Sequence, residues 1–342
     1  MTRSARPRRA TAADVAQEAG VSQSTVSRVF SDDGRLTRET KDRVRAVARE
    51  LGYRPHAVAR SLITRRTNIV GLVTSDLSNP FYPRLVETFT TRLHALGRRV
   101  LLLTAGVGED LDDLLPEVLS SQVDGYVVAS ASVSSGVVRE CVRIGTPVVL
   151  VNRHAPGSGA SAVSCDNVAG GRTVADALLA AGCVRPAYVA GREDASTNIE
   201  RERGFFTRLR ERGVTDVRRE RGHYTYASGR EAARRLLALP ERERPDGLFC
   251  ANDITAMGAL DAARELGVRV PQDLAVVGFD DIPAAAWSAY DLTTVRQPVE
   301  DMIGRSLDLL LAHVERPDLA PELEVLPGTL VERGSSRRKG QA

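Results

Sequence analysis

The heptapeptide SQSTVSR, which begins at Ser22, brings together side chains that can recognise other molecules through fixed hydrogen-bond geometry. The amide of Gln23 can pair bidentately with adenine, and the guanidinium of Arg28 can pair bidentately with guanine. Ser24 tolerates several bases, while the hydroxyls of Ser22 and Thr25 suit phosphate oxygens. These residue types predict contacts with nucleic acid, provided that one helix presents Gln23, Ser24 and Arg28 on the same side.

The surrounding sequence, TAADVAQEAGVSQSTVSRVF, predicts two short helices joined by a glycine turn. Thr11 can cap the first helix, Gly20 ends it, and Ser22 can cap the second. Apolar residues recur on one face of each helix and predict a small shared core: Val15, Ala19, Val21, Val26 and Val29. A third helix opens at Thr37 and stops at Gly52. This arrangement is a helix-turn-helix, in which the first turn of the second helix enters the major groove.

A capped amphipathic helix pair inside an ordinary helical domain fits the same pattern. The charge distribution favours the nucleic-acid interpretation, because residues 1–66 carry fifteen Arg and Lys against seven Asp and Glu. The net charge of the whole chain is only +3, so the remainder is acidic. A basic end attached to an acidic body is typical of a nucleic-acid reader joined to another binding domain. Arginine is abundant throughout the chain, however, so a solvated Arg-rich surface remains an alternative.

The chain has 342 residues, 42% of them hydrophobic, which is enough for two or three domains with packed cores. After position 68, short branched apolar runs alternate with helical stretches. The runs predict strands at 69–74, 100–104, 126–129, 148–151, 187–190, 248–251 and 274–279. The helical stretches are 81–96, 111–120, 171–181, 199–212, 228–239 and 254–266. This alternation predicts an α/β fold with two doubly wound parallel-sheet lobes.

Several motifs resemble the LacI/GalR family of transcriptional regulators. DVAQEAGVSQSTVSRVF, the helix over 37–53 and RPHAVARSL are similar to the family's DNA-binding headpiece. SNPFY, ANDITAMGAL, VVGFDDIP and LTTVRQP follow in the order of its effector-binding domain, so the resemblance covers nearly all of 11–334. The resemblance implies a regulator, most often a repressor, that binds a palindromic operator as a homodimer. It also implies control by a small-molecule effector, a sugar or related metabolite, bound between two lobes.

The resemblance also supplies domain boundaries, which periodicity alone does not give. It implies a basic arm at 1–10, a helix-turn-helix domain at 11–53, and a hinge helix with linker at 54–67. A two-lobed domain similar to type I periplasmic binding proteins follows at 68–334, with a tail at 335–342. The first lobe comprises about 68–165 plus 295–326. The second comprises about 166–294 plus the C-terminal strand.

Polar residues follow the predicted strands, where open parallel sheets bind their ligands. They are Ser75, Asp76, Asn152, Asn252, Asp253, Asp280 and Asp281. The resemblance singles out Asp280, Arg201 and Asn252 as effector-gripping residues and places Phe81, Tyr82 and Tyr224 at aromatic positions. With Ser75 and Asn152 these form the predicted effector site, in which charged groups hold hydroxyls and aromatic faces cover a sugar ring or a base.

Each of these residues also has a structural alternative. An Asp after a strand often caps the next helix, and we expect this role for Asp253 and Asp281. Arg203 could take the place of Arg201. Trp287, the only tryptophan, fits either the core or the binding site.

Other functional classes have less support. Gly106-x-Gly108 after a strand hints at a dinucleotide loop, but Leu111 occupies the third glycine position. The four cysteines form no C-x-x-C pair, so we expect no metal site. The sequence has no G-x-S-x-G motif and no Walker phosphate loop, so we expect no cofactor and no enzymatic activity. No apolar run approaches the ~20 residues of a membrane span. The N-terminus, MTRSARPRRA, lacks the apolar segment of a signal peptide, which argues against a periplasmic binding protein and predicts a cytoplasmic location.

The segment over 57–62 is too short to be helical alone, and it follows Pro55. His56 stands at its cap position, where the family usually has Asn, a better cap. In the family the matching segments pair across the dimer axis and wedge a leucine, here Leu62, into the minor groove. The resemblance therefore predicts a switch that becomes helical on operator DNA, and a passive tether is the alternative.

Overall fold

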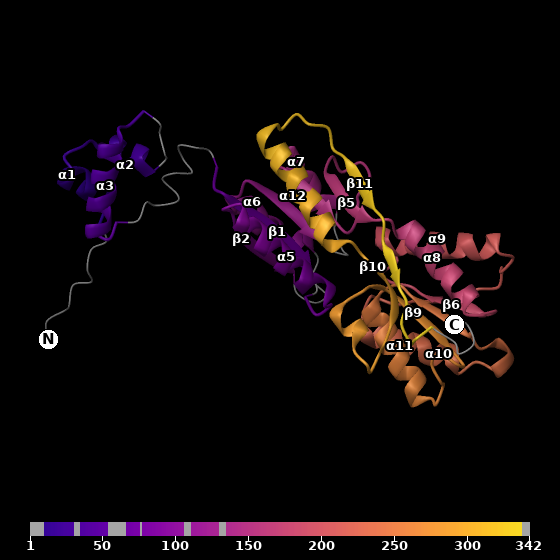
Figure 1. Cartoon of the computed structure of the whole chain (residues 1–342). Helices are drawn as coiled ribbons and strands as arrows, with labels where there is room; N and C mark the ends of the chain where they lie inside the picture. Colours follow the sequence, from indigo (N-terminus) through magenta and orange to yellow (C-terminus); the bar gives the residue numbers. More distant parts are fainter. Residues whose placement is uncertain are drawn as a thin grey trace, which may run out of the picture. The chain divides into compact units, whose positions relative to one another are not determined.

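The computed structural model describes residues 10–30, 35–53, 66–75, 77–105, 111–129 and 135–336 (Figure 1). The chain divides into two compact units, Met1–Asn68 and Ile69–Ala342. Among the described helices, none is both long enough and apolar enough to cross a membrane. His56 and Leu62 lie outside the described residues, as does most of the predicted hinge.

The described part of the first unit contains three helices, α1 (Ala12–Glu18), α2 (Gln23–Phe30) and α3 (Arg38–Glu50). Thr11 and Asp14 form a capping box at the start of α1, and Thr37 caps α3 by accepting from the amide of Thr40. Gly20 has φ +62°, a left-handed conformation that lets the chain turn between α1 and α2. The core of the unit consists of the buried residues Val15, Ala16, Ala19, Val26, Val29, Val44 and Ala48. The predicted helical headpiece is therefore confirmed, although Val21 is only partly buried.

The second unit contains two six-stranded sheets. The first has the order β11-β5-β4-β3-β1-β2, and all its strand pairs are parallel. Its strands are β1 (Ile69–Ser75), β2 (Arg99–Ala105), β3 (Gly125–Ala129), β4 (Val148–Val151), β5 (Ser161–Cys165) and β11 (Leu323–Leu326). Helices α5 (Phe81–Ala95), α6 (Leu115–Ser120), α7 (Ser135–Arg143) and α12 (Val299–Glu315) accompany this sheet. Every residue of β3, β4 and β5 is buried, as expected for parallel strands covered on both faces.

The second sheet has the order β12-β10-β9-β8-β6-β7, in which only β12 runs antiparallel to its neighbour among the described pairs. Its strands are β6 (Pro186–Val189), β7 (Arg218–Glu220), β8 (Gly247–Cys250), β9 (Ala275–Asp280), β10 (Thr293–Arg296) and β12 (Thr329–Val331). Helices α8 (Asn167–Ala180), α9 (Ser196–Glu211), α10 (Tyr226–Leu237) and α11 (Asp253–Glu265) accompany it. The predicted α/β class with two doubly wound lobes is confirmed.

The chain passes between the two sheets three times. It leaves the first sheet after β5, returns after β10 through α12, which packs on β3, β4 and β5, and enters the second sheet again at β12. Figure 1 shows α12 followed by β11, from which the yellow end of the chain continues to the strands of the second sheet. Apolar runs did not predict β5, β7, β10, β11 or β12, because these strands are short and each contains Ser, Thr, Arg or Glu. Their places in the sheets depend on pairing with neighbours rather than on their own composition.

Candidate functional site

The predicted reading side chains of α2 lie on the solvent side of the first unit. Gln23, Ser24 and Arg28 are exposed, whereas Val26 and Val29 on the opposite face are buried in the core. Burial of those two valines fixes the rotation of α2 and therefore which side chains it presents. Three exposed groups within two turns give an amide, a hydroxyl and a guanidinium that remain available to a partner.

Ser22 has a structural role in addition to its predicted contact role. Its Oγ accepts from the backbone amide of Thr25 at 3.1 Å, which caps the first turn of α2. The same oxygen lies 2.8 Å from the Ser24 hydroxyl and 2.9 Å from the Thr25 hydroxyl. The three hydroxyls are thus held together at the N-terminus of the helix, where the positive end of the dipole favours anions.

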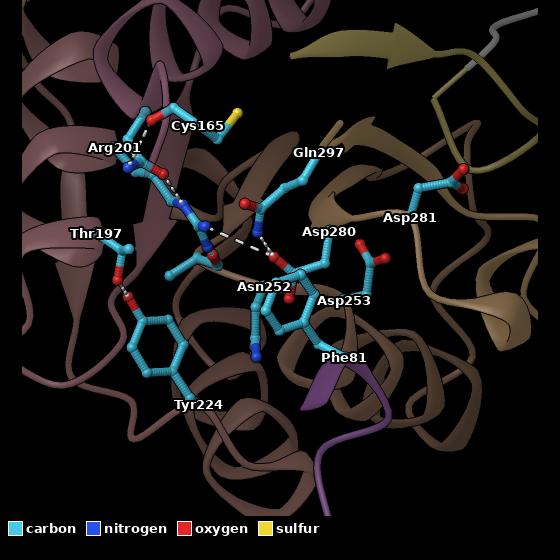
Figure 2. Close-up of polar contacts among 12 residues, drawn as sticks. Phe81, Cys165, Thr197, Arg201, Tyr224, Asn252, Asp253, Asp280, Asp281 and Gln297 are labelled. Carbon is cyan, nitrogen blue, oxygen red and sulfur yellow. Dashed lines mark hydrogen bonds and ion pairs between the residues drawn. The ribbon is translucent and has the colours of Figure 1, made fainter. Parts of the chain in front are cut away.

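The predicted Arg201 lies on α9 and is 2% exposed. Its Nε donates to Asn167 Oδ1 at 2.9 Å, and its Nη1 donates to the carbonyl oxygen of Ala251 at 2.6 Å. Nη2 lies 3.6 Å from Asp280 Oδ1, and the guanidinium carbon lies 3.7 Å from the centroid of the Phe279 ring. Figure 2 shows the guanidinium directed toward Asp280, and a dashed line joins the two. Its position is therefore fixed from four sides.

Close packing of α8 on α9 brings Asn167 next to Arg201. A Cβ added to Gly204 of α9 would collide with the carbonyl oxygen of Val168, and one added to Gly171 of α8 would collide with the carbonyl oxygen of Arg201. The two helices approach this closely because both positions lack a side chain. Two glycines therefore determine the distance at which the guanidinium meets its amide partner.

Asp280 ends β9 with a 5% exposed side chain and φ +121°, an unusual backbone conformation for a non-glycine residue. Its Oδ1 accepts from Gln297 Nε2 at 2.7 Å (Figure 2). Burial raises the pKa of Asp280 to about 6, and the nearby Arg201 opposes this shift. The Oε1 of Gln297 is buried and has no hydrogen-bond partner among the described residues. We call Arg201, Asn167, Asp280 and Gln297 the Arg201 cluster.

Asn252 and Asp253 make contacts within the fold that differ from the helix cap predicted for Asp253. Asn252, predicted as an effector contact, caps α11 by accepting from the Thr255 amide at 3.2 Å. The predicted cap, Asp253, instead accepts from the amide of Ile282 at 2.9 Å and from the hydroxyl of Thr294 at 2.5 Å. The prediction that Asp253 caps the helix was wrong by one position, because Asn252 already occupies the cap with extended backbone.

Asp281 is not a cap either. Its carboxylate binds Arg296 and Arg333, each at 2.6 Å, and the 3-10 turn that follows is preceded by Ile282. Trp287 is 60% exposed, so it belongs to neither the core nor the Arg201 cluster.

The predicted aromatic residues are buried. Phe81 and Tyr82 open α5 and meet edge to face, with ring centroids 5.4 Å apart. Tyr224 has φ +61°, and its hydroxyl lies 2.9 Å from the Thr197 hydroxyl (Figure 2). Burial raises the pKa of Tyr224, so its hydroxyl stays protonated and can both donate and accept.

Two further predicted residues end strands of the first sheet. Ser75 is the last residue of β1. Asn152 follows β4 with φ +68°, and its Oδ1 is buried with no hydrogen-bond partner among the described residues. Parallel pairing of β1, β3 and β4 brings these two strand ends to one edge of the sheet.

Sequence reasoning missed four residues that the structure places in or near this region: Asn167, Thr197, Gln297 and Arg153. Asn167 follows β5, but β5 gave no apolar signal of its own. Arg153 follows Asn152 and is 7% exposed, and burial lowers its pKa while Tyr82, Asp194 and Tyr224 oppose that shift. Its place after a predicted strand is the signal that could have identified it.

These side chains are of types that suit the binding of a polar ligand. A fixed guanidinium, a carboxyl group, side-chain amides and phenol hydroxyls are the groups that hold hydroxyl-rich ligands in one orientation. Among the described residues, no group of three His, Cys, Asp or Glu side chains is placed to hold a metal ion.

Comparison with known proteins relates both units to one family. Residues 11–56 match the model of bacterial regulatory proteins of the lacI family, and residues 175–336 match a periplasmic binding protein-like domain. The transcriptional regulator DegA of Bacillus subtilis is 34% identical over 84% of this chain and 87% of its own.

Two solved structures are similar along nearly the whole chain. The lac repressor dimer bound to operator and the anti-inducer ONPF has a TM-score of 0.86 at 25% identity and covers 97% of this chain and 100% of its own. A complex of the regulator CelR with cellobiose has a TM-score of 0.71 at 32% identity and covers 96% and 100%. The chain therefore belongs to the lacI family of bacterial regulatory proteins.

Proposed function

We propose that this protein is a transcriptional repressor that binds a palindromic operator as a homodimer and responds to a small-molecule effector. The observation that carries the proposal is the exposed face of α2, where Gln23, Ser24 and Arg28 stand free of the core. Burial of Val26 and Val29 keeps that face of α2 toward solvent. Residues 11–56, which include α2, match the lacI family model. The protein acts in the cytoplasm, where its DNA target is found.

On the operator, each group of α2 has its own task. Arg28 and Gln23 contact base edges in the major groove and carry sequence choice. Ser24 and Thr25 hold phosphates or tolerant base positions, and Ser22 shapes the helix start that presents them. In the segment over 54–67, Leu62 inserts into the minor groove and His56 precedes the inducible helix.

Two-fold symmetry follows from the size of the headpiece. One three-helix unit buries too little surface on DNA for a specific site, and a dimer doubles the contact and requires a palindrome. The lac repressor in the similar structure is a dimer on its operator, which supports the same assembly here.

The effector is a sugar or sugar derivative bound between the two lobes. Arg201 and Asp280 bind its hydroxyls, Asn152 and Ser75 approach from the first sheet, and Phe81, Tyr82 and Tyr224 cover its apolar face. Asn252 contributes the amide nitrogen that capping leaves unused. CelR binds cellobiose with a chain of the same fold, which supports this ligand class.

The DNA assignment is tested by selecting an operator from random duplexes with the full chain and comparing two variants on it. Arg28→Ala should weaken operator binding and relax preference at one base pair. Arg38→Ala, which removes an almost fully exposed arginine of α3, should change operator and random DNA alike. Equal behaviour of both variants on operator and random DNA would refute the assignment.

The effector assignment is tested by thermal shift with ribose, glucose, sucrose and cellobiose, because a ligand of the folded state raises the melting temperature. A sugar that stabilises the wild type should no longer stabilise Asp280→Ala. Stabilisation that survives in this variant would show that the ligand binds elsewhere.

A further inference from the structure

A continuous chain of hydrogen bonds extends from the Arg201 cluster to a histidine beside the first sheet. Arg201 Nε donates to Asn167 Oδ1 at 2.9 Å, and Asn167 Nδ2 donates to Glu200 Oε2 at 3.0 Å. The other carboxylate oxygen, Glu200 Oε1, lies 2.6 Å from His154 Nε2. Because a carboxylate can only accept, Nε2 of His154 carries the proton. Four side chains thus form one line from a loop to the buried guanidinium.

Glu200 sets the direction in which the Asn167 amide points. The Asn167 nitrogen faces three acceptors, namely Glu200 Oε2, the Cys165 carbonyl at 3.1 Å and the Ser164 hydroxyl at 3.3 Å. A flipped amide would put its oxygen against the carboxylate and its nitrogen against the Arg201 guanidinium, and both contacts would be repulsive. The carboxylate therefore helps keep the Asn167 oxygen aimed at Arg201.

His154 connects this line to the first sheet. It lies in the segment between β4 and β5, both strands of the first sheet, whereas Glu200 lies on α9, which packs on α8 beside the second sheet. The backbone amide of His154 also donates to the Ser196 hydroxyl in the first turn of α9, at 3.5 Å. The side chains of His154 and Glu200 are 23% and 18% exposed, so water competes little for their contact.

We propose that Glu200 is a positioning residue for the Arg201 cluster, and that His154 makes the position of Arg201 depend on the first sheet. A displacement of the segment carrying His154 relative to α9 would break the hydrogen bond between His154 and Glu200. Glu200 would then hold Asn167 less firmly, and Asn167 would hold Arg201 less firmly. The role in effector recognition rests on the proposed function. The hydrogen-bonded line from His154 to Arg201 stands without it.

The same helix offers a matched control. Glu202, two residues along α9, pairs with Arg219 at 2.7 Å, and its side chain is 27% exposed. Both glutamates accept close hydrogen bonds at similar depth, but the described contacts of Glu202 do not lead to Arg201. A purely structural role for Glu200 would make Glu200→Leu and Glu202→Leu behave alike.

The first experiment measures solvent exchange of the Arg201 Nε–H by NMR on the full chain with ¹⁵N-labelled arginine, the signal being assigned by its loss in Arg201→Lys. Glu200→Leu should speed this exchange about tenfold, because Asn167 loses the acceptor that orients it. Glu200→Gln, which can still accept from Asn167, should retain slow exchange, and Glu202→Leu should leave it unchanged. His154→Ala should give an intermediate rate.

An unchanged exchange rate in Glu200→Leu, or an equal change in Glu202→Leu, overturns the proposal. If Glu200→Leu does not fold, His154→Ala against Glu202→Leu decides the same question.

The second experiment titrates these variants with whichever of ribose, glucose, sucrose or cellobiose stabilises the wild type. Glu200→Leu should lower the affinity for that sugar about tenfold, as expected when one hydrogen bond to a charged group is lost. Glu200→Gln and Glu202→Leu should bind it normally. Undiminished affinity in Glu200→Leu overturns the role in recognition. If none of the four sugars binds, the proposed effector class fails, and the exchange measurement still decides the positioning role.

Discussion

The exposed face of α2 and the Arg201 cluster both carry an arginine and a side-chain amide, but they use them in opposite ways. Arg28 and Gln23 are exposed, and no hydrogen bond or ion pair holds either side chain among the described residues. Arg201 and Asn167 are buried, and each hydrogen-bonds other parts of the chain. An exposed reader can be changed at little cost to the fold. A buried side chain such as Arg201 also stabilises the fold, so we expect a substitution there to change stability together with the proposed recognition.

The largest effect should come from Arg201→Ala. The change leaves Asp280 buried without its cation and leaves the Ala251 carbonyl and Asn167 oxygen without a donor. Breaking a buried ion pair of this kind costs about 3–5 kcal/mol of unfolding free energy. Denaturant unfolding of the full chain measures it. Effector response should be lost, while operator binding without effector stays largely unchanged.

The control for Arg201→Ala is Arg203→Ala, which removes an exposed arginine from the same helix. It should alter unfolding free energy by less than about 0.5 kcal/mol. If the two variants lost similar stability, the contrast between buried and exposed arginines would not hold within α9. It would also mean that Arg203 shares the role assigned to Arg201.

The next effect is the pH dependence that Asp280 imposes on stability. Burial raises its folded pKa from 3.8 to about 6, so the folded state favours the protonated carboxyl. Its stabilising contribution is fully present below about pH 4 and is lost as the pH rises through about 6. This loss is absent in Asp280→Asn. The unfolding free energy of the wild type should therefore fall relative to that of the variant by up to about 1.4 kcal/mol per pH unit in that window. Unfolding free energies measured from pH 4 to 7 test this.

Glu265, on the protein surface, should make stability depend on pH in the opposite direction. Hydrogen bonds from Arg230 and Arg234 lower its pKa below 4.5. Its contribution to stability is therefore present above that pH and is lost as the pH falls. Glu265→Gln should cost stability at neutral pH and nothing in acid. If both variants changed in the same direction with pH, burial would not be what distinguishes the two carboxyls.

The two regions also differ in how far the sequence predicts them. The caps at Thr11 and Thr37, the turn at Gly20 and the alternation around Val26 and Val29 are local, so spacing alone predicts the headpiece. The fold class of the larger unit also follows, because its central strands are apolar enough to be seen one by one.

The Arg201 cluster is assembled through space from α8, α9, β9 and the end of β10, and no local pattern joins these segments. Resemblance pointed to Arg201 and Asp280, but it gave no sign of Asn167 or Glu200. Their roles depend on the glycine contact between α8 and α9. The cap of α11 at Asn252 instead of Asp253 likewise depends on backbone geometry that residue types do not specify.

On the exposed side of the comparison, Arg28→Ala should cost about 1–3 kcal/mol of binding free energy at the operator and relax preference at one base pair. The unfolding free energy should not change measurably, because the side chain is exposed on α2. Fluorescence anisotropy on the operator and on single-base variants measures both effects. An equal loss on random DNA would identify Arg28 as a phosphate contact instead.

Ser22→Ala should have the smallest effect and separates the two roles of this residue. Its Oγ accepts from the Thr25 amide, and loss of such a cap costs about 1 kcal/mol. Amide exchange of Thr25 and Val26 should therefore quicken, and operator affinity should fall only as far as the start of α2 opens. Ser22→Asn, whose side chain also caps helices, should restore both properties. If Ser22→Ala instead weakened operator binding while the amides of Thr25 and Val26 stayed protected from exchange, Ser22 would bind phosphate directly. Ser22 would then act as a DNA contact together with the exposed residues of α2.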